Sequence, residues 1–155
     1  MRRVIVALTA SLAVPAGLIV ALPTGSAFAS SAVPTIVTCS KLTGTSTTTT
    51  STGTATGCNQ TAITGGSGTQ TAKTTSAGTT FSLKWKSGKT TTGKTTFSVV
   101  TPSKCPSTFS EEVKAVGTVT GGTATKLKGG KTTNTICVST TTGKFELLPG
   151  SKYKV

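Results

Sequence analysis

The chain lacks histidine and aspartate altogether, and its only arginines are Arg2 and Arg3. Its acidic residues are Glu111, Glu112 and Glu146. Histidine and carboxylates supply most general acid-base and metal-binding chemistry, and arginine supplies most bidentate recognition of phosphate and carboxylate. A chain this poor in all of them has few routes to catalysis. We therefore predict a protein that is not an enzyme and that binds no metal or cofactor.

The glutamates and cysteines do not form a familiar catalytic or zinc-binding pattern. Glu111 and Glu112 are adjacent, so on a strand their side chains point to opposite faces. A glycosidase needs two carboxylates at a fixed separation, which would require the fold to bring Glu146 beside one of them in a cleft. The cysteines have no C-x2-C spacing and no histidine to complete a zinc site.

The N-terminus has the features of a secretory signal peptide. A basic start is followed by an apolar run over residues 4–22 and by an A-x-A pattern that ends at Ala29. We predict a signal peptide over residues 1–29, cleaved after Ala29, and a single domain over residues 30–155 of a secreted protein. The alternative is a retained membrane anchor, because the apolar run is about as long as a bilayer-spanning helix.

Four cysteines in a secreted chain indicate two disulfide bonds. Three pairings are possible, and we favour the sequential one, Cys39 with Cys58 and Cys105 with Cys137. Positions 39 and 58 are equidistant from the middle of the threonine run at residues 47–50. A hairpin that turns in this run would place Cys39 and Cys58 opposite one another on neighbouring strands.

The 36 threonines of residues 30–155 and the frequent glycines favour short strands over helices. In the segment 81–86, Phe81, Leu83 and Trp85 alternate with polar residues, which predicts one buried and one solvated face. We expect Trp85 to be buried with this face rather than to form an exposed stacking platform. Residues 80–101 are then predicted to form a long hairpin.

Other strands are expected at 35–42, 53–58, 60–64, 113–120, 123–128, 133–140 and 143–148. The segment 65–78 is rich in Gly, Ser and Thr and is predicted to be a loop. Many short strands without crossover helices indicate an all-β, antiparallel fold. We predict an immunoglobulin-like β-sandwich of about seven to nine strands with two disulfides.

Residues 88–95 match the phosphate-loop pattern G-x-x-x-x-G-K-[ST] at every position. That motif binds phosphate only between a parallel strand and the N-terminus of a helix. The residues that follow it here alternate as a strand does, and no aspartate is present to order magnesium. We therefore predict no nucleotide binding.

Lysine is the abundant charged residue. Removal of Arg2 and Arg3 lowers the formal charge from +13 to +11, which 14 lysines carry. Such a field attracts anionic polymers or membrane surfaces, and lysine suits diffuse, salt-sensitive contacts. The densest basic patch comprises Lys84, Lys86, Lys89 and Lys94. We predict a monomer of the cell envelope that binds teichoic acids or acidic glycans through these lysines, without specific nucleic-acid binding.

Four segments resemble small secreted β-proteins of actinobacteria, a resemblance that covers the mature chain and implies no activity. They are V-T-C-S-K-L-T-G at 37–44, T-G-C-N at 56–59, L-K-W-K-S-G-K at 83–89 and the ending L-L-P-G-S-K-Y-K-V. The expected architecture is also similar to that of the neocarzinostatin-type apoproteins, which are secreted immunoglobulin-like sandwiches with two disulfides. Those proteins are acidic and have short disulfide loops, unlike this chain.

The alternative function is that of a secreted inhibitor or a small-ligand carrier of the immunoglobulin-like sandwich type. An inhibitor would present a rigid exposed loop, for which residues 104–107 around Cys105 are the best candidate. A carrier would contain an apolar cavity. A measured structure separates these possibilities, because only the carrier requires a cavity.

Overall fold

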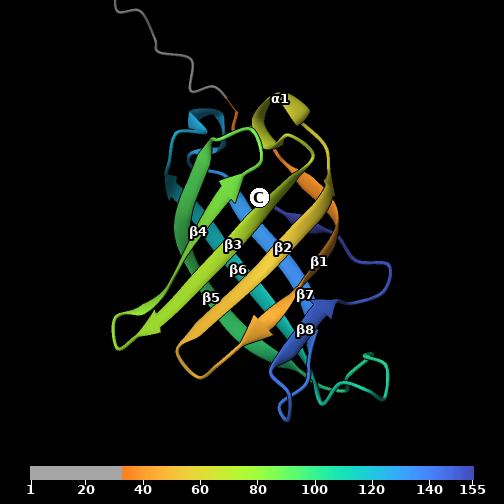
Figure 1. Ribbon diagram of the computed structural model, residues 1–155. Coiled ribbons are helices and arrows are strands. Elements are labelled where there is room, and N and C mark those ends of the chain that lie inside the picture. The colour runs from red at the N-terminus through yellow and green to blue at the C-terminus, as the bar shows by residue number, and fades with distance from the viewer. Residues whose placement is uncertain (1–32) are drawn as a thin grey trace, which may run out of the picture. The chain divides into compact units, whose positions relative to one another are not determined.

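The computed structural model describes residues 33–155, so the predicted signal peptide and its cleavage after Ala29 lie outside the described residues (Figure 1). Within the described residues, no helix is long and apolar enough to cross a membrane. The strands are β1 (Thr38–Ser46), β2 (Thr50–Cys58), β3 (Ser67–Thr75), β4 (Gly78–Trp85), β5 (Thr90–Val100), β6 (Glu111–Gly121), β7 (Lys131–Val138), β8 (Lys144–Leu147) and β9 (Tyr153–Lys154). The helical turns are α1 (Thr61–Thr64) and η1 (Thr125–Leu127).

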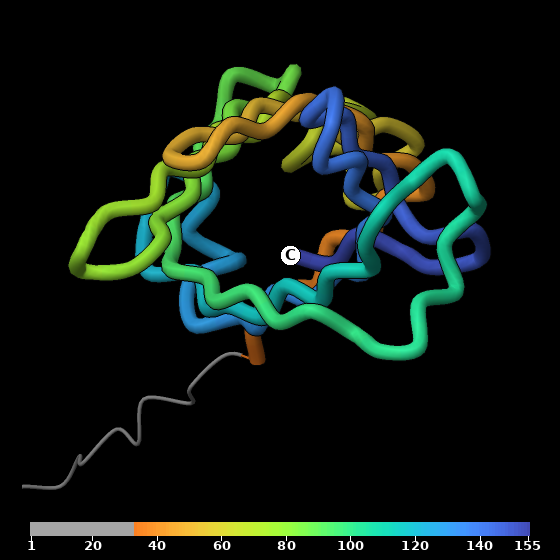
Figure 2. The backbone as a smooth tube through the Cα atoms, turned by 90° about the horizontal axis from the view of Figure 1, so that it is seen from below, coloured from red at the N-terminus to blue at the C-terminus, as the bar shows by residue number. Residues whose placement is uncertain are grey.

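The strands form a closed antiparallel barrel. Each strand from β1 to β8 pairs with the next, and β8 returns to pair with β1, so that the sheet has no free edge there. Figure 2 looks along the barrel and shows this ring of strands. The predicted immunoglobulin-like β-sandwich is therefore wrong, and the fold is an eight-stranded closed barrel with two disulfides.

The eighth position of the barrel is shared by two short strands. β8 pairs with β1 at residues 43–45 and with β7 at residues 136–138. β9 continues in the same direction, pairing with β1 at residues 38–39 and with β7 at Thr133. The segment 148–152 interrupts them. Closure of the barrel thus depends on both β8 and β9.

Inward-facing glycines oppose inward-facing aromatic side chains on neighbouring strands. Gly68 is the register partner of Trp85, Gly93 of Phe81, and Gly44 of Phe145. A Cβ atom at Gly68 would lie 2.6 Å from Cε3 of Trp85. Small barrels are filled by such alternation of small and large residues. The aromatic rings therefore fill space that the glycines leave free.

The barrel has a capped end and a turn end. The capped end carries α1 (Figure 1) and η1. Its interior is filled by buried side chains that include Val37, Leu127 and Val155. The backbones of Val37 and Val155 exchange two hydrogen bonds of 2.7 and 2.9 Å. At the turn end lie the connections 47–49, 76–77, 101–110 and 139–143.

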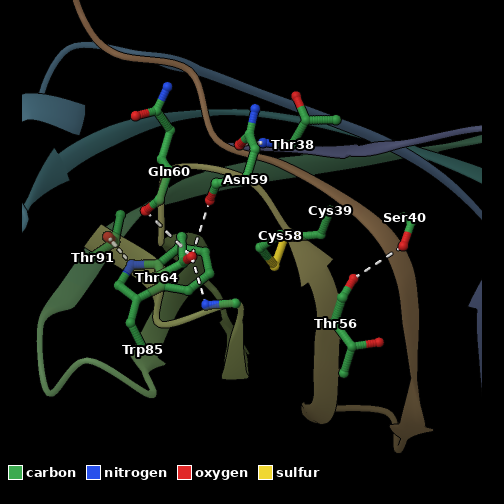
Figure 3. The surroundings of a disulfide bond; sticks show 11 residues. Thr38, Cys39, Ser40, Thr56, Cys58, Asn59, Gln60, Thr64, Trp85 and Thr91 are labelled. Atoms are coloured by element: carbon green, nitrogen blue, oxygen red, sulfur yellow. Dashed lines mark hydrogen bonds between the residues drawn. A yellow bond between two sulfur atoms is a disulfide. The ribbon is translucent and has the colours of Figure 1, made fainter. Parts of the chain in front are cut away.

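Both predicted disulfides are present. Cys39 and Cys58 are register partners on β1 and β2, with Cα atoms 3.9 Å apart (Figure 3). The hairpin turns where the threonine run predicted it, with the Thr47 N–H donating to the Thr50 carbonyl. Cys105 in the β5–β6 connection is bonded to Cys137 on β7. Two disulfides indicate that the protein folds in an oxidising, extracellular type of environment.

Trp85 is buried, as predicted, and the hairpin of residues 80–101 is present as β4 and β5. Three other segments differ from the prediction. Residues 60–64 and 123–128 contain α1 and η1 instead of strands, and the predicted loop 65–78 contains β3. The inward residues of β3 include Gly68 and Ala72, which are small, and the ring of Trp85 on β4 covers Gly68. Hydropathy therefore gave no sign of this strand.

The single tyrosine, Tyr153, is expected to make folding sensitive to alkaline pH. Its side chain is 2% exposed, and burial raises the pKa of the phenol. The unfolded chain ionises near pH 10 while the folded chain keeps its proton, so stability is intact below that pH. Above it, stability should fall by about 1.4 kcal/mol per pH unit.

An alkaline titration followed by phenolate absorbance and by circular dichroism checks this expectation. The two signals should change together, because the phenol ionises only when the chain unfolds. Tyr153→Phe should reduce the alkaline loss of stability, because it removes the ionisable phenol. Phenolate absorbance that rises near pH 10 while the circular dichroism is unchanged would contradict the assignment.

Candidate functional site

The outer surface of strands β3 to β7 carries a row of alternating lysine and threonine. Lys73 pairs in register with Thr80, Thr80 with Lys94, Lys94 with Thr118, and Thr118 with Lys131. Register partners on adjacent strands lie side by side, so these five residues form one line across five strands. We name Lys73, Lys94 and Lys131, with the two threonines between them, the lysine row.

The geometry of the lysine row suits repeated anionic groups. Successive lysines are two strands apart, which corresponds to about 10 Å between their backbones. Lys94 lines two shallow surface hollows, one shared with Lys73 and the other with Lys131. All three lysines are exposed, and the Lys131 ammonium donates to the Thr118 hydroxyl at 3.4 Å. An anion in either hollow would meet lysine ammonium and threonine hydroxyl groups.

No carboxylate side chain lies along the lysine row. Strands β2 to β5 contain no acidic residue. Glu112 on β6 and Glu146 on β8 both pair in register with Cys137, on another part of the barrel wall. Glu112 is 5% exposed, and its carboxylate accepts the Lys104 backbone N–H at 2.7 Å. The positive field of the row is therefore not neutralised by neighbouring carboxylates.

The four predicted anion-binding lysines are spread along the β4–β5 hairpin. Lys84 and Lys94 project from the outer faces of β4 and β5, at register positions four residues apart. Lys86 and Lys89 lie in the turn at the capped end. The Lys89 ammonium donates to the Ala62 carbonyl at 3.1 Å, so it contacts the end of α1. Only Lys94 of the four belongs to the lysine row.

Lys73 and Lys131 were not singled out from the sequence. They lie far from Lys94 along the chain, and only the strand register brings the three together. No local pattern marked them, because Lys73 lies in the segment 65–78 that was predicted to be a loop and Lys131 precedes the predicted strand 133–140. Their alignment with Lys94 cannot be recognised before the pairing of the strands is known.

The turn end of the barrel contains a hollow of about 200 Å³, which we name the lumen hollow. It is lined by Leu42, Ser46, Ser51, Gln70, Phe97, Val113, Asn134, Ile136, Val138 and Phe145. No charged side chain lines it. An apolar cavity was predicted only for the carrier alternative, and none of these residues was predicted to line it.

The phosphate-loop pattern at residues 88–95 has no phosphate-loop structure. Gly88 lies in the β4–β5 turn, and Gly93 and Lys94 lie inside strand β5. β5 is antiparallel to both its neighbours, and no helix follows the motif. Among the described residues there is also no cluster of histidine, cysteine, aspartate or glutamate that could hold a metal ion.

No family model matches this chain, and neither a curated protein nor a solved structure shows significant similarity to it. The resemblance to small secreted actinobacterial β-proteins therefore remains a prediction from four short segments.

Proposed function

We propose that this protein binds anionic polymers of the cell envelope, such as teichoic acids or acidic glycans, through the lysine row. The observation that carries the proposal is the line of three exposed lysines across five strands, along which no carboxylate side chain lies. A net charge of +11 for residues 30–155 adds a long-range attraction. Catalysis has no part in this function.

The side chains of the row support polymer binding rather than recognition of one small anion. Lysine is a flexible point charge that does not impose the planar geometry of a guanidinium group. Threonine hydroxyls at the intervening positions can donate to phosphate or carboxylate oxygens. The flat, open arrangement allows a chain of repeating anions to lie across several strands at once. Binding should weaken as salt is added, because the contacts are exposed.

The same observations support a location outside the cell. The disulfides suit an extracellular protein. A secreted protein with this charge would remain at an anionic cell wall instead of diffusing away. We therefore propose a secreted, cell-wall-associated protein.

The test is a comparison of two triple variants that remove the same charge. Lys73→Gln, Lys94→Gln and Lys131→Gln removes the row, whereas Lys41→Gln, Lys144→Gln and Lys152→Gln removes three exposed lysines elsewhere. Retention on purified cell walls that carry teichoic acid is measured at low and high salt. Loss of the row should weaken binding about tenfold, since each exposed ion pair contributes about 0.5 kcal/mol.

The control variant should bind within about threefold of the wild type, because it loses only long-range attraction. Walls from which the anionic polymer has been removed should retain little of any of the proteins. Equal weakening by the two triple variants would show that net charge acts without a defined surface. Retention that does not respond to salt, or no retention at all, would overturn the proposal.

A further inference from the structure

The lumen hollow opens to solvent at the turn end of the barrel. Phe97 on β5 points inward and lines the hollow, yet it is 47% exposed. Val99, two residues further along the same face of β5, is 60% exposed. Its register partner is Val113, which also lines the hollow. An apolar rim of this kind leaves a route from solvent into the hollow.

The wall of the hollow combines apolar surface with a few polar groups. Leu42, Val113, Ile136, Val138 and Phe145 supply aliphatic and aromatic surface. The polar side chains come from Ser46, Ser51, Gln70 and Asn134. Small-molecule sites in proteins are built in this way, with mostly apolar walls and a small number of polar groups that orient the ligand. The mouth of a barrel is a common position for such sites.

The side chain of Gln70 is the strongest indication that the lumen hollow binds a ligand. It lies on the inward face of β3, between Gly53 of β2 and Leu83 of β4 in the register. Its side-chain Oε1 is buried and accepts no hydrogen bond from the described residues. A buried acceptor without a partner is unfavourable, and natural proteins contain few of them. Because Gln70 lines the lumen hollow, a rotation of its amide that turns Oε1 towards the hollow would let a ligand donate a hydrogen bond to this atom and remove the cost.

We propose that the lumen hollow binds a compact, neutral molecule that has an apolar body of one or two rings and donates one hydrogen bond to Gln70 Oε1. The size follows from the volume of about 200 Å³, since an engineered protein cavity of about 150 Å³ binds benzene. Neutrality follows from the absence of charged side chains in the lining. This site is independent of the lysine row, because its residues face the inside of the barrel.

The test uses indole, which has an apolar two-ring body and one N–H donor, and 1-methylindole, which lacks the donor. Binding is measured by titration with detection of methyl resonances by NMR. The methyl signals of Val113, Ile136 and Val138 should shift, and those of Val37 and Val119 at the capped end should not. Loss of one hydrogen bond should make 1-methylindole bind about tenfold more weakly.

Two kinds of variant locate the site. Ser51→Phe should fill the hollow and abolish binding of both compounds, with Val113→Phe as a second filling variant if the first does not fold. Gln70→Leu removes the unpartnered oxygen without a large change of volume, so the barrel should stay folded. In this variant indole and 1-methylindole should bind equally well.

Three results would overturn the proposal. One is the absence of indole binding to the folded wild-type protein. Another is a set of shifts spread over the outer surface. The third is an unchanged preference for indole over 1-methylindole in Gln70→Leu, which would mean that the amide does not contact the ligand. None of these results bears on the lysine row, which the cell-wall experiment tests separately.

Discussion

Replacement of Trp85 by alanine is expected to lower the free energy of unfolding by about 4 kcal/mol, the usual cost of truncating a fully buried tryptophan. Trp85 is 1% exposed, and its ring covers Gly68 on the neighbouring strand. Its indole N–H donates to the Thr91 hydroxyl at 2.8 Å inside the barrel (Figure 3). The change would leave a cavity and a buried hydroxyl group without its donor.

Urea denaturation followed by circular dichroism measures this loss. Trp85→Phe should cost about 2 kcal/mol, because it keeps part of the ring but loses the hydrogen bond. Phe97→Ala is the matched control, since Phe97 also points inward but is half exposed at the turn end. It should cost about 1 kcal/mol. A loss below 2 kcal/mol for Trp85→Ala would show that the capped end is not closely packed.

The second large effect is expected for Gly44→Ala, which should destabilise the protein by about 3 kcal/mol through overpacking. Gly44 pairs with Gly53 of β2 on one side and with Phe145 of β8 on the other. A Cβ atom there would lie 2.1 Å from the Thr52 carbonyl oxygen and 2.6 Å from Cζ of Phe145. One of these contacts is with backbone, so a side-chain rotation cannot relieve both.

Gly121→Ala provides the control for the change of residue type. A Cβ atom at Gly121 would meet only the Thr92 hydroxyl, at 3.2 Å. The unfolded chain loses the same backbone freedom in both variants, so the difference between them measures steric conflict at Gly44. Gly121→Ala should remain within about 1 kcal/mol of the wild type. Equal stability of the two variants would contradict the close approach of Gly44 to Thr52 and Phe145.

The individual strands of the barrel could be predicted from the sequence, but the closure of the barrel could not. The alternation of Phe81, Leu83 and Trp85 predicts a strand with one buried face, and this is observed. The same alternation occurs in sandwiches and in barrels, because both bury one face of each strand. The barrel is distinguished by the pairing of β1 with β8, which come from opposite ends of the domain. No local pattern encodes that pairing.

The candidate sites could likewise be predicted only where local sequence brings their residues together. The disulfide between Cys39 and Cys58 was predictable, because a local turn brings the two residues together. The lysine row and the lumen hollow were not, since each is assembled from several strands. Glycine was the main reason why residues 65–78 were wrongly predicted to be a loop. We took glycine as a sign of a break between strands, but Gly68 and Gly93 lie inside strands, where each makes room for an aromatic ring.

The division of the eighth position between β8 and β9 makes this part of the barrel wall weaker than the rest. β8 shares three register pairs with β1 and three with β7, whereas β5 and β6 share nine. Local opening in proteins begins where few backbone hydrogen bonds and few buried contacts must be broken. We therefore expect β8 to separate transiently from its two neighbours while the remaining strands stay paired. Because Phe145 of β8 lines the lumen hollow, this motion would govern how fast molecules exchange with the interior.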